Sequence, residues 1–171
     1  SFLLGSMFAY IAASPFIFQS FYGLSAFIFS LCFGANGSAL VIGANVGGKL
    51  PNRQALAIGV FAFVVAALYT IAVLIIQPYW LFIEIGFFAM LLLMSITFPA
   101  ISSLAMESER QYAGSASALL GFAPFFLGGV VSPLVGIGNI FYSTSFVILI
   151  CALLALSIYW MIRHKIPTSA E

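Results

Sequence analysis

Glu84 is the residue of this 171-residue chain that is best placed to do chemistry inside an apolar segment. It is the only acidic residue in the long stretch between Arg53 and Glu107. A carboxyl group in apolar surroundings is costly unless it exchanges a proton or binds a cation, so Glu84 is a possible proton or cation site. It also lies near one end of its segment, which leaves open that the side chain only reaches water at the mouth of a cavity.

A second group of residues suits the binding of an amphipathic molecule. Tyr10 and Ser14 are four residues apart and share one helical face, and Asn36 places an amide in the next apolar segment. Aromatic and aliphatic surface with a few orienting polar groups favours binding without covalent chemistry. The predicted substrate cavity is lined by Tyr10, Ser14, Asn36, Phe88, Leu91 and Ser95.

The serines have a simpler interpretation as well. Within a membrane, a hydroxyl group often serves only to bond to a neighbouring helix. Ser95 shares a helical face with Glu84 and Leu91, provided that Pro99 does not shift the register. Both interpretations of these hydroxyl groups therefore stay open.

Enzymatic chemistry is not expected. The apolar segments contain no Ser/His, Asp/Asp or His/Glu pair, and the single histidine, His164, lies beside Arg163 and Lys165. No second metal ligand lies near it in sequence, so we expect no metal and no cofactor. Cys32 and Cys151 are expected to be small buried apolar side chains.

The composition is that of a membrane protein. Hydrophobic residues make up 64% of the chain and charged residues 5%, and the mean hydropathy is +1.22. No water-soluble surface can be built from such a composition, so lipid must be the solvent. Alternating segments typical of a membrane barrel are missing, which favours helices.

Turn signals divide the chain into lengths that cross about 30 Å of hydrocarbon. We predict an all-α polytopic membrane protein whose residues 1–165 form a six-helix transmembrane bundle, with 166–171 as a cytoplasmic tail. The predicted spans are 2–19, 25–48, 54–76, 79–106, 113–135 and 140–162.

The basic residues set the orientation. All five Lys and Arg residues lie at three places, and the intervals between them let a helix pair leave the membrane and return. The positive-inside rule then places both chain ends in the cytoplasm. Tyr79 and Trp80, and at the other end Tyr159 and Trp160, are expected at the two interfaces.

Polar and small residues recur with a period of three helices. The first, second, fourth and fifth spans carry such faces, whereas 54–76 and 140–162 are almost uniformly apolar. This order predicts two three-helix units, the arrangement of inverted repeats in half of a transporter. We expect the four lined spans to surround a concave face and the two apolar spans to contact fewer neighbours.

The fifth span has small residues along one side. Gly114, Gly121 and Gly128 belong to this stripe. Small residues at such spacing let membrane helices approach closely, so helix packing is the first interpretation and substrate contact the second.

Several segments resemble one family of carriers. Residues 7–19 (MFAYIAASPFIFQ) and 22–25 (YGLS) closely resemble the seventh span of the bicyclomycin/chloramphenicol-resistance (Bcr/CflA) drug:proton antiporters of the major facilitator superfamily. Residues 33–36 (FGAN) and 114–122 (GSASALLGF) are similar to the eighth and eleventh spans of that family. The resemblance covers essentially the whole chain.

This resemblance implies the C-terminal half of a twelve-helix, 3+3-repeat carrier that exports drug-like amphipathic compounds against inward proton flow. It implies a bacterial inner membrane, and as partners a small-molecule substrate, protons, the lipid bilayer and a missing N-terminal six-helix half; no nucleic acid is involved. The loop 48–53 (GKLPNR) is similar to a superfamily loop, with Asn52 in place of an acidic residue. That change removes the charge that a gating role of this loop would use.

Two other functions stay open. The chain taken alone could be a non-transporting membrane scaffold or a truncated relic of a carrier. An oligomeric channel subunit is the third alternative, but it needs rings of charge or of carbonyl groups, and Glu84 supplies only one charge per chain.

Overall fold

The computed structural model describes residues 2–108 and 113–163, and over these ranges the chain is helical without any strand. Its elements in chain order are α1 (Phe2–Pro15), the π-helix η1 (Phe16–Phe21), α2 (Ala26–Gly47), α3 (Asn52–Ile76), α4 (Trp80–Ser95), α5 (Phe98–Ser108), α6 (Ala113–Val135) and α7 (Ile140–Ile162). Within the described ranges, six spans are long and apolar enough to cross a membrane. The prediction of an all-α polytopic membrane protein is confirmed.

The first span changes its helix type at a proline. Pro15 has no N–H group, so the carbonyl of Ile11 loses its usual intrahelical partner. The hydroxyl of Ser14 points back to that carbonyl at 3.5 Å, and the chain continues from Phe16 as a π-helix. Pro15 therefore coincides with a change of helical winding within this span.

The predicted 79–106 span consists of two helices. α4 ends at Ser95 and α5 begins at Phe98, with a turn between them. Pro99 cannot donate to the Ser95 carbonyl, and the N–H of Thr97 instead bonds to Met94 at 3.1 Å. The register is therefore not continuous across Pro99, so residues of α5 do not share the face of Glu84 as an unbroken helix would place them.

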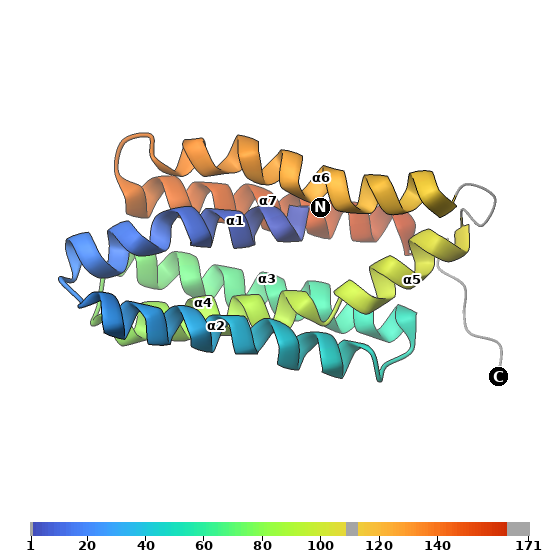
Figure 1. Cartoon of the computed structure of the whole chain (residues 1–171), viewed down its shortest axis with the longest axis horizontal. Helices are drawn as coiled ribbons and strands as arrows, with labels where there is room; N and C mark the ends of the chain where they lie inside the picture. The colour runs from blue at the N-terminus through green and yellow to red at the C-terminus, as the bar shows by residue number, and fades with distance from the viewer. Residues whose placement is uncertain (1, 109–112, 164–171) are drawn as a thin grey trace.

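The helices pack as two groups of three, and each group includes one span from the other half of the chain. α4 lies against α2 and α3, α1 lies against α6 and α7, and α3 and α7 pack on each other. Figure 1 shows these two groups, one above the other. The pattern is unchanged when the first three spans are exchanged with the last three, as expected for two repeated three-helix units.

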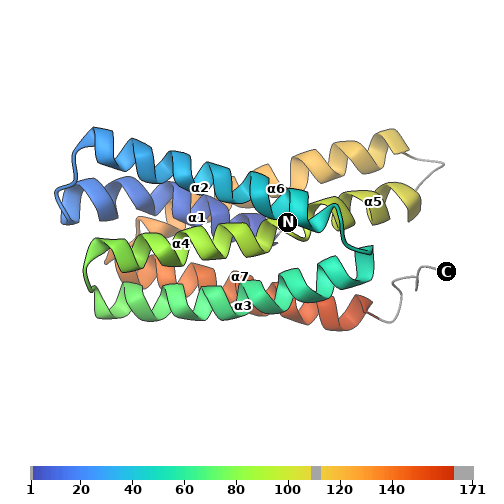
Figure 2. The same cartoon turned by 90° about the horizontal axis from the view of Figure 1, so that it is seen from below.

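The expectation that the spans 54–76 and 140–162 contact fewer neighbours is wrong. α3 packs along both α4 and α7, and α7 packs along both α3 and α1. Figure 2 shows α3 and α7 on one side of the bundle, with α2 and α6 on the other. The most exposed spans are α2 and α6. An apolar helix packs as well against a helix as against lipid, so low polarity did not decide exposure.

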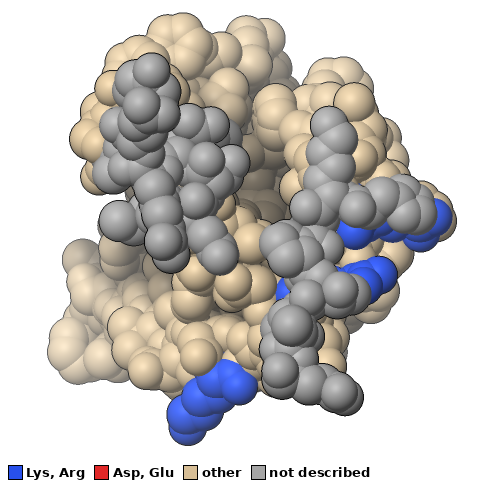
Figure 3. Space-filling model, turned by 90° about the vertical axis from the view of Figure 1, so that its right-hand side faces the viewer, with Lys and Arg blue, Asp and Glu red and all other residues tan. Residues whose placement is uncertain are grey.

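Basic residues gather at one end of the bundle. Lys49 follows α2, Arg53 opens α3 and Arg163 follows α7, and these helix ends lie together in Figure 1. Figure 3 looks onto this end and shows the blue side chains, with a cleft between two lobes beside them. The two aromatic pairs lie at opposite ends of the bundle, as expected. Tyr79 and Trp80 lie at the start of α4, and Tyr159 and Trp160 lie near the end of α7. The other two basic residues of the chain, Arg110 and Lys165, lie outside the described residues.

Candidate functional site

Three polar side chains from three spans meet in the apolar interior. The Nδ2 of Asn36 on α2 donates to the hydroxyl of Tyr10 on α1 and to Oε1 of Glu84 on α4, both at 2.9 Å. All three side chains are buried, and Glu84 is only 7% exposed. We call Tyr10, Asn36 and Glu84 the polar triad. Its two hydrogen bonds join residues that lie 26 and 48 positions apart in the sequence.

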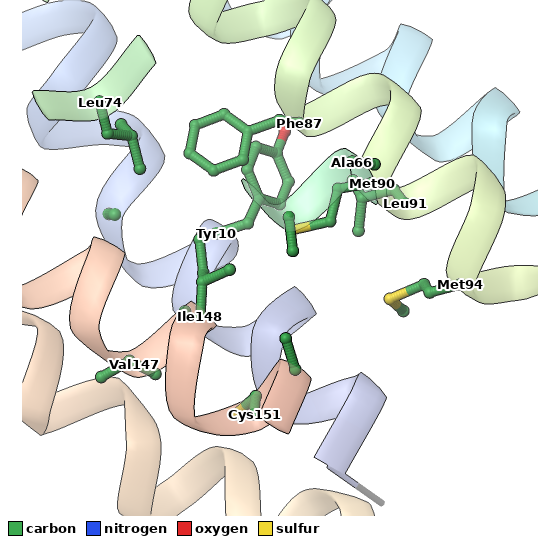
Figure 4. Packing of buried hydrophobic residues seen from close by; sticks show 14 of the residues in the cluster. Tyr10, Ala66, Leu74, Phe87, Met90, Leu91, Met94, Val147, Ile148 and Cys151 are labelled. Atoms are coloured by element: carbon green, nitrogen blue, oxygen red, sulfur yellow. The ribbon is translucent and has the colours of Figure 1, made fainter. Parts of the chain in front are cut away.

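Aromatic rings pack against the Tyr10 ring of the triad. The Tyr10 ring lies 4.9 Å from Phe87 between centroids, and it stacks on Phe33 at 5.9 Å with an interplanar angle of 19°. Figure 4 shows the Tyr10 ring beside Phe87, with Met90 close by. Phe87 is fully buried, whereas Phe33 is 41% exposed. The triad is therefore covered on one side by a ring that itself faces outward.

Two acceptor atoms of the triad have no hydrogen-bond partner among the described residues. They are Oδ1 of Asn36 and Oε2 of Glu84, and both are buried. Buried polar atoms are normally paired, because an unpaired one costs free energy comparable to a lost hydrogen bond. The triad therefore has spare capacity for a donor group. The interpretation of Glu84 as a solvated rim residue does not fit its burial.

Of the other predicted cavity residues, Ser14 lies beside Tyr10, and none takes part in the two hydrogen bonds that Asn36 donates. Ser14 is buried and its hydroxyl is directed to its own helix, as is that of Ser95, which donates to the Leu92 carbonyl at 2.8 Å. Leu91 is a buried core residue and Phe88 is half-buried. Both hydroxyl groups therefore bond within their own helix, whereas the simpler interpretation from the sequence expected bonds to a neighbouring helix.

The glycines of the fifth span differ from one another. A side-chain carbon added to Gly128 would meet the ring of Phe8 on α1. The same carbon on Gly114 or Gly121 would meet no atom within 4 Å. Only Gly128 of the three packs closely against another helix of the described chain.

Residues that the sequence analysis did not single out complete the site. Phe33 precedes Asn36 by three positions and Phe87 follows Glu84 by three, so a search one helical turn from each polar residue would have found both. Gly43, Gly47 and Gly59 bring α2 and α3 against the backbone or side chains at the α4–α5 junction. The spacing of four between Gly43 and Gly47 is a small-residue packing signal that was available.

A cavity of about 220 Å³ lies nearer the basic end, between α1, α5 and α6. Its wall is almost wholly apolar and includes one hydroxyl residue. The lining residues are Leu3, Leu4, Phe98, Ile101, Ser102, Leu120 and Pro124. Within the described residues, no group of histidine, cysteine or acidic side chains could hold a metal ion.

Comparison with known proteins gives one informative similarity. The chain is 36% identical over 142 residues to a protein of Bacillus subtilis (strain 168) described as the uncharacterized MFS-type transporter YdgK. The match covers 81% of the chain and 35% of that protein, so the chain spans little more than a third of its length. No family model matches the chain, and no solved structure does.

This similarity supports membership of the major facilitator superfamily, which MFS denotes. The six-span helical bundle is consistent with half of a transporter of that fold. Together they support a multi-pass membrane protein.

Proposed function

We propose that the chain is the C-terminal half of a major facilitator superfamily exporter of the Bcr/CflA type. In this proposal it removes drugs or other small amphipathic compounds from a bacterial cell in exchange for protons. It lies in the inner membrane with both ends in the cytoplasm, and it needs an N-terminal half to complete a transport cycle. Alternating access requires one bundle to rock against another, so a single half binds but does not cycle.

The observation that carries this proposal is the polar triad inside an apolar bundle. A buried carboxyl group bonded to an amide from another span is expensive, and within membranes such groups are found mainly at substrate, ion or proton sites. Tyr10, Asn36 and Glu84 come from three of the four spans that the sequence pattern predicts to surround a concave face. The aromatic rings around them suit amphipathic compounds.

Two further observations support a missing half. The first span packs with the last two spans, and the fourth span packs with the second and third. This arrangement of two three-helix units is expected for one transporter half. On α6, Gly114 and Gly121 present small surfaces that nothing in the described chain covers. A second bundle that packs against α6 would use these positions for close approach.

The three basic helix ends at one end of the bundle support the proposed orientation.

Transport measurements test the proposal. The complete reading frame that encodes the chain is expressed in a bacterium that lacks its own drug exporters, alongside the 171-residue chain alone. We expect the complete protein to lower the accumulation of amphipathic dyes, and to lose this effect when the proton gradient is collapsed. We expect the chain alone to be inserted without exporting any dye.

Two outcomes would contradict the proposal. If the complete protein is inserted but exports no compound from a broad panel, the scaffold interpretation gains support. If the chain alone conducts ions when reconstituted in vesicles, it is a channel subunit.

A further inference from the structure

We infer that the polar triad binds the protonated amine of an organic cation. In this arrangement, Oε2 of Glu84 and Oδ1 of Asn36 accept hydrogen bonds from the ammonium group, and the rings of Tyr10, Phe33 and Phe87 lie around it. The inference rests on the proposed function and deepens it, because it names the substrate class of the same site.

The first argument is the unused acceptor capacity. Asn36 is 1% exposed and Glu84 7%, yet one oxygen of each has no partner in the described chain. Each side chain is also held in place, because the shared Nδ2 bonds to both Tyr10 and Glu84. The amide nitrogen is fully used, so only its oxygen stays available. A ligand that donates two hydrogen bonds therefore fits this site.

The second argument is charge. A buried carboxylate is strongly destabilised unless a positive group compensates it. Lys49, Arg53 and Arg163 lie at one end of the bundle, beyond the spans that carry the triad. In sequence, Arg110 and Lys165 also fall outside those spans. An ionised Glu84 therefore has no compensating Lys or Arg within this chain's spans.

The third argument compares an ammonium group with a bare proton and with a water molecule. A proton on Oε2 of Glu84 neutralises the carboxyl group and gives it one O–H donor, and a water molecule brings no charge. An alkylammonium group carries the charge and up to three N–H donors. Aromatic faces around a desolvated cation add further attraction. Tyr10 lies between Phe33 and Phe87, with centroid distances of 5.9 and 4.9 Å, so such faces are present.

A route to the site passes Phe33. This ring stacks on Tyr10 and is 41% exposed, so it is the part of the site that reaches the surface of the described chain. Next to it on α2, side-chain carbons added to Gly34 and Gly37 would meet nothing within 4 Å. An aromatic amine can therefore approach along this face of α2 and exchange its contact with the solvent or lipid for contact with the rings.

Binding measurements on the 171-residue chain in lipid nanodiscs test the inference without a second half or a proton gradient. The probes are phenethylamine, which is cationic at neutral pH, and phenethyl alcohol, its neutral counterpart of similar shape. Isothermal titration calorimetry gives both affinities. We expect the amine to bind about tenfold more tightly than the alcohol. We expect Glu84→Gln to reduce this preference to about twofold or less, because the amide keeps the size but loses the charge.

Matched variants guard against a folding artefact. Glu107→Gln makes the same chemical change near the end of α5 and should keep the preference. Asn36→Leu removes the second acceptor and should weaken the amine several-fold more than the alcohol. Each variant is used only if its helical circular dichroism matches that of the parent chain at the assay temperature and its melting transition lies well above that temperature.

The position of the bound amine is tested with the two cysteines. Cys32 precedes Asn36 by one helical turn, whereas Cys151 lies on α7. A saturating amine should slow the alkylation of Cys32 by N-ethylmaleimide and leave Cys151 unchanged.

Equal affinities for amine and alcohol, or a preference that survives in Glu84→Gln, would overturn the inference even if the complete protein exports drugs. If the amine preference is found but the complete protein exports nothing, the binding site stands and the proposed transport function fails.

Discussion

Asn36 joins α2 to α4 by donating a hydrogen bond from its Nδ2 to Oε1 of Glu84 at 2.9 Å. The same nitrogen donates to the hydroxyl of Tyr10, so one amide ties three spans together. Two spans of one three-helix unit and the first span of the other meet at this amide. A change that moves α4 relative to α1 must therefore alter the surroundings of Glu84.

Asn36→Leu should disturb the protein more than Asn45→Leu does. Leucine at position 36 leaves both Tyr10 and Glu84 without their donor, at a cost of about 1–2 kcal/mol in the free energy of unfolding. Asn45 is exposed and bonds only to the Val41 carbonyl of its own helix, so its replacement should cost less than about 0.5 kcal/mol.

Thermal melting in detergent and drug-resistance assays at equal expression check this difference. If both variants melt and export like the parent, Asn36 is only a packing residue.

Glu84→Gln should weaken the export of cationic compounds and leave neutral ones closer to normal. The amide keeps the size and hydrogen bonding of the side chain but loses the charge that a cation and a proton would share. Resistance or vesicle-transport profiles over both classes of compound, at two external pH values, measure the effect.

Glu107→Gln is the control, since it removes a carboxyl group outside the triad. A uniform loss over all compounds would instead indicate a structural or general coupling role for Glu84.

Gly43→Ala should destabilise the bundle, whereas Gly37→Ala on the same helix should not. A side-chain carbon on Gly43 collides with the Leu92 carbonyl and the Ser95 hydroxyl, so α2 must move away from α4 at a cost of about 1–3 kcal/mol. The same carbon on Gly37 meets no atom within 4 Å, and alanine there should stabilise the helix by about 0.5–1 kcal/mol. Melting temperatures of the two variants and the parent decide between these signs, and a stabilised Gly43→Ala variant would show that the contact is looser than described.

Gly128 and Gly121 of α6 should respond differently to alanine. In the isolated chain, Gly128→Ala should cost about 1 kcal/mol because the new carbon meets the Phe8 ring, whereas Gly121→Ala should be neutral or slightly stabilising.

In the complete protein, Gly121→Ala should lower export if a second bundle packs against α6. Unchanged export together with unchanged stability of the complete protein would show that Gly121 faces lipid.

The sequence by itself determined the membrane class, the six spans and the position of the charged ends. These follow from length, hydropathy and charge spacing, which are properties of consecutive residues and need no knowledge of packing. Glu84, Asn36 and Tyr10 were also recognisable as candidates, because polar groups are rare in the apolar spans.

Only the tertiary structure decided which of these residues meet. Periodicity grouped Glu84 with Leu91 and Ser95 on one face of α4, yet its hydrogen-bond partner is Asn36 from α2. Helical spacing identifies neighbours on one helix but says nothing of the rotation or depth at which another helix packs. For the same reason, the apolar α3 was expected to contact fewer neighbours and instead packs along both α4 and α7. Between helices and lipid the hydrophobic effect gives no preference, so shape complementarity decides.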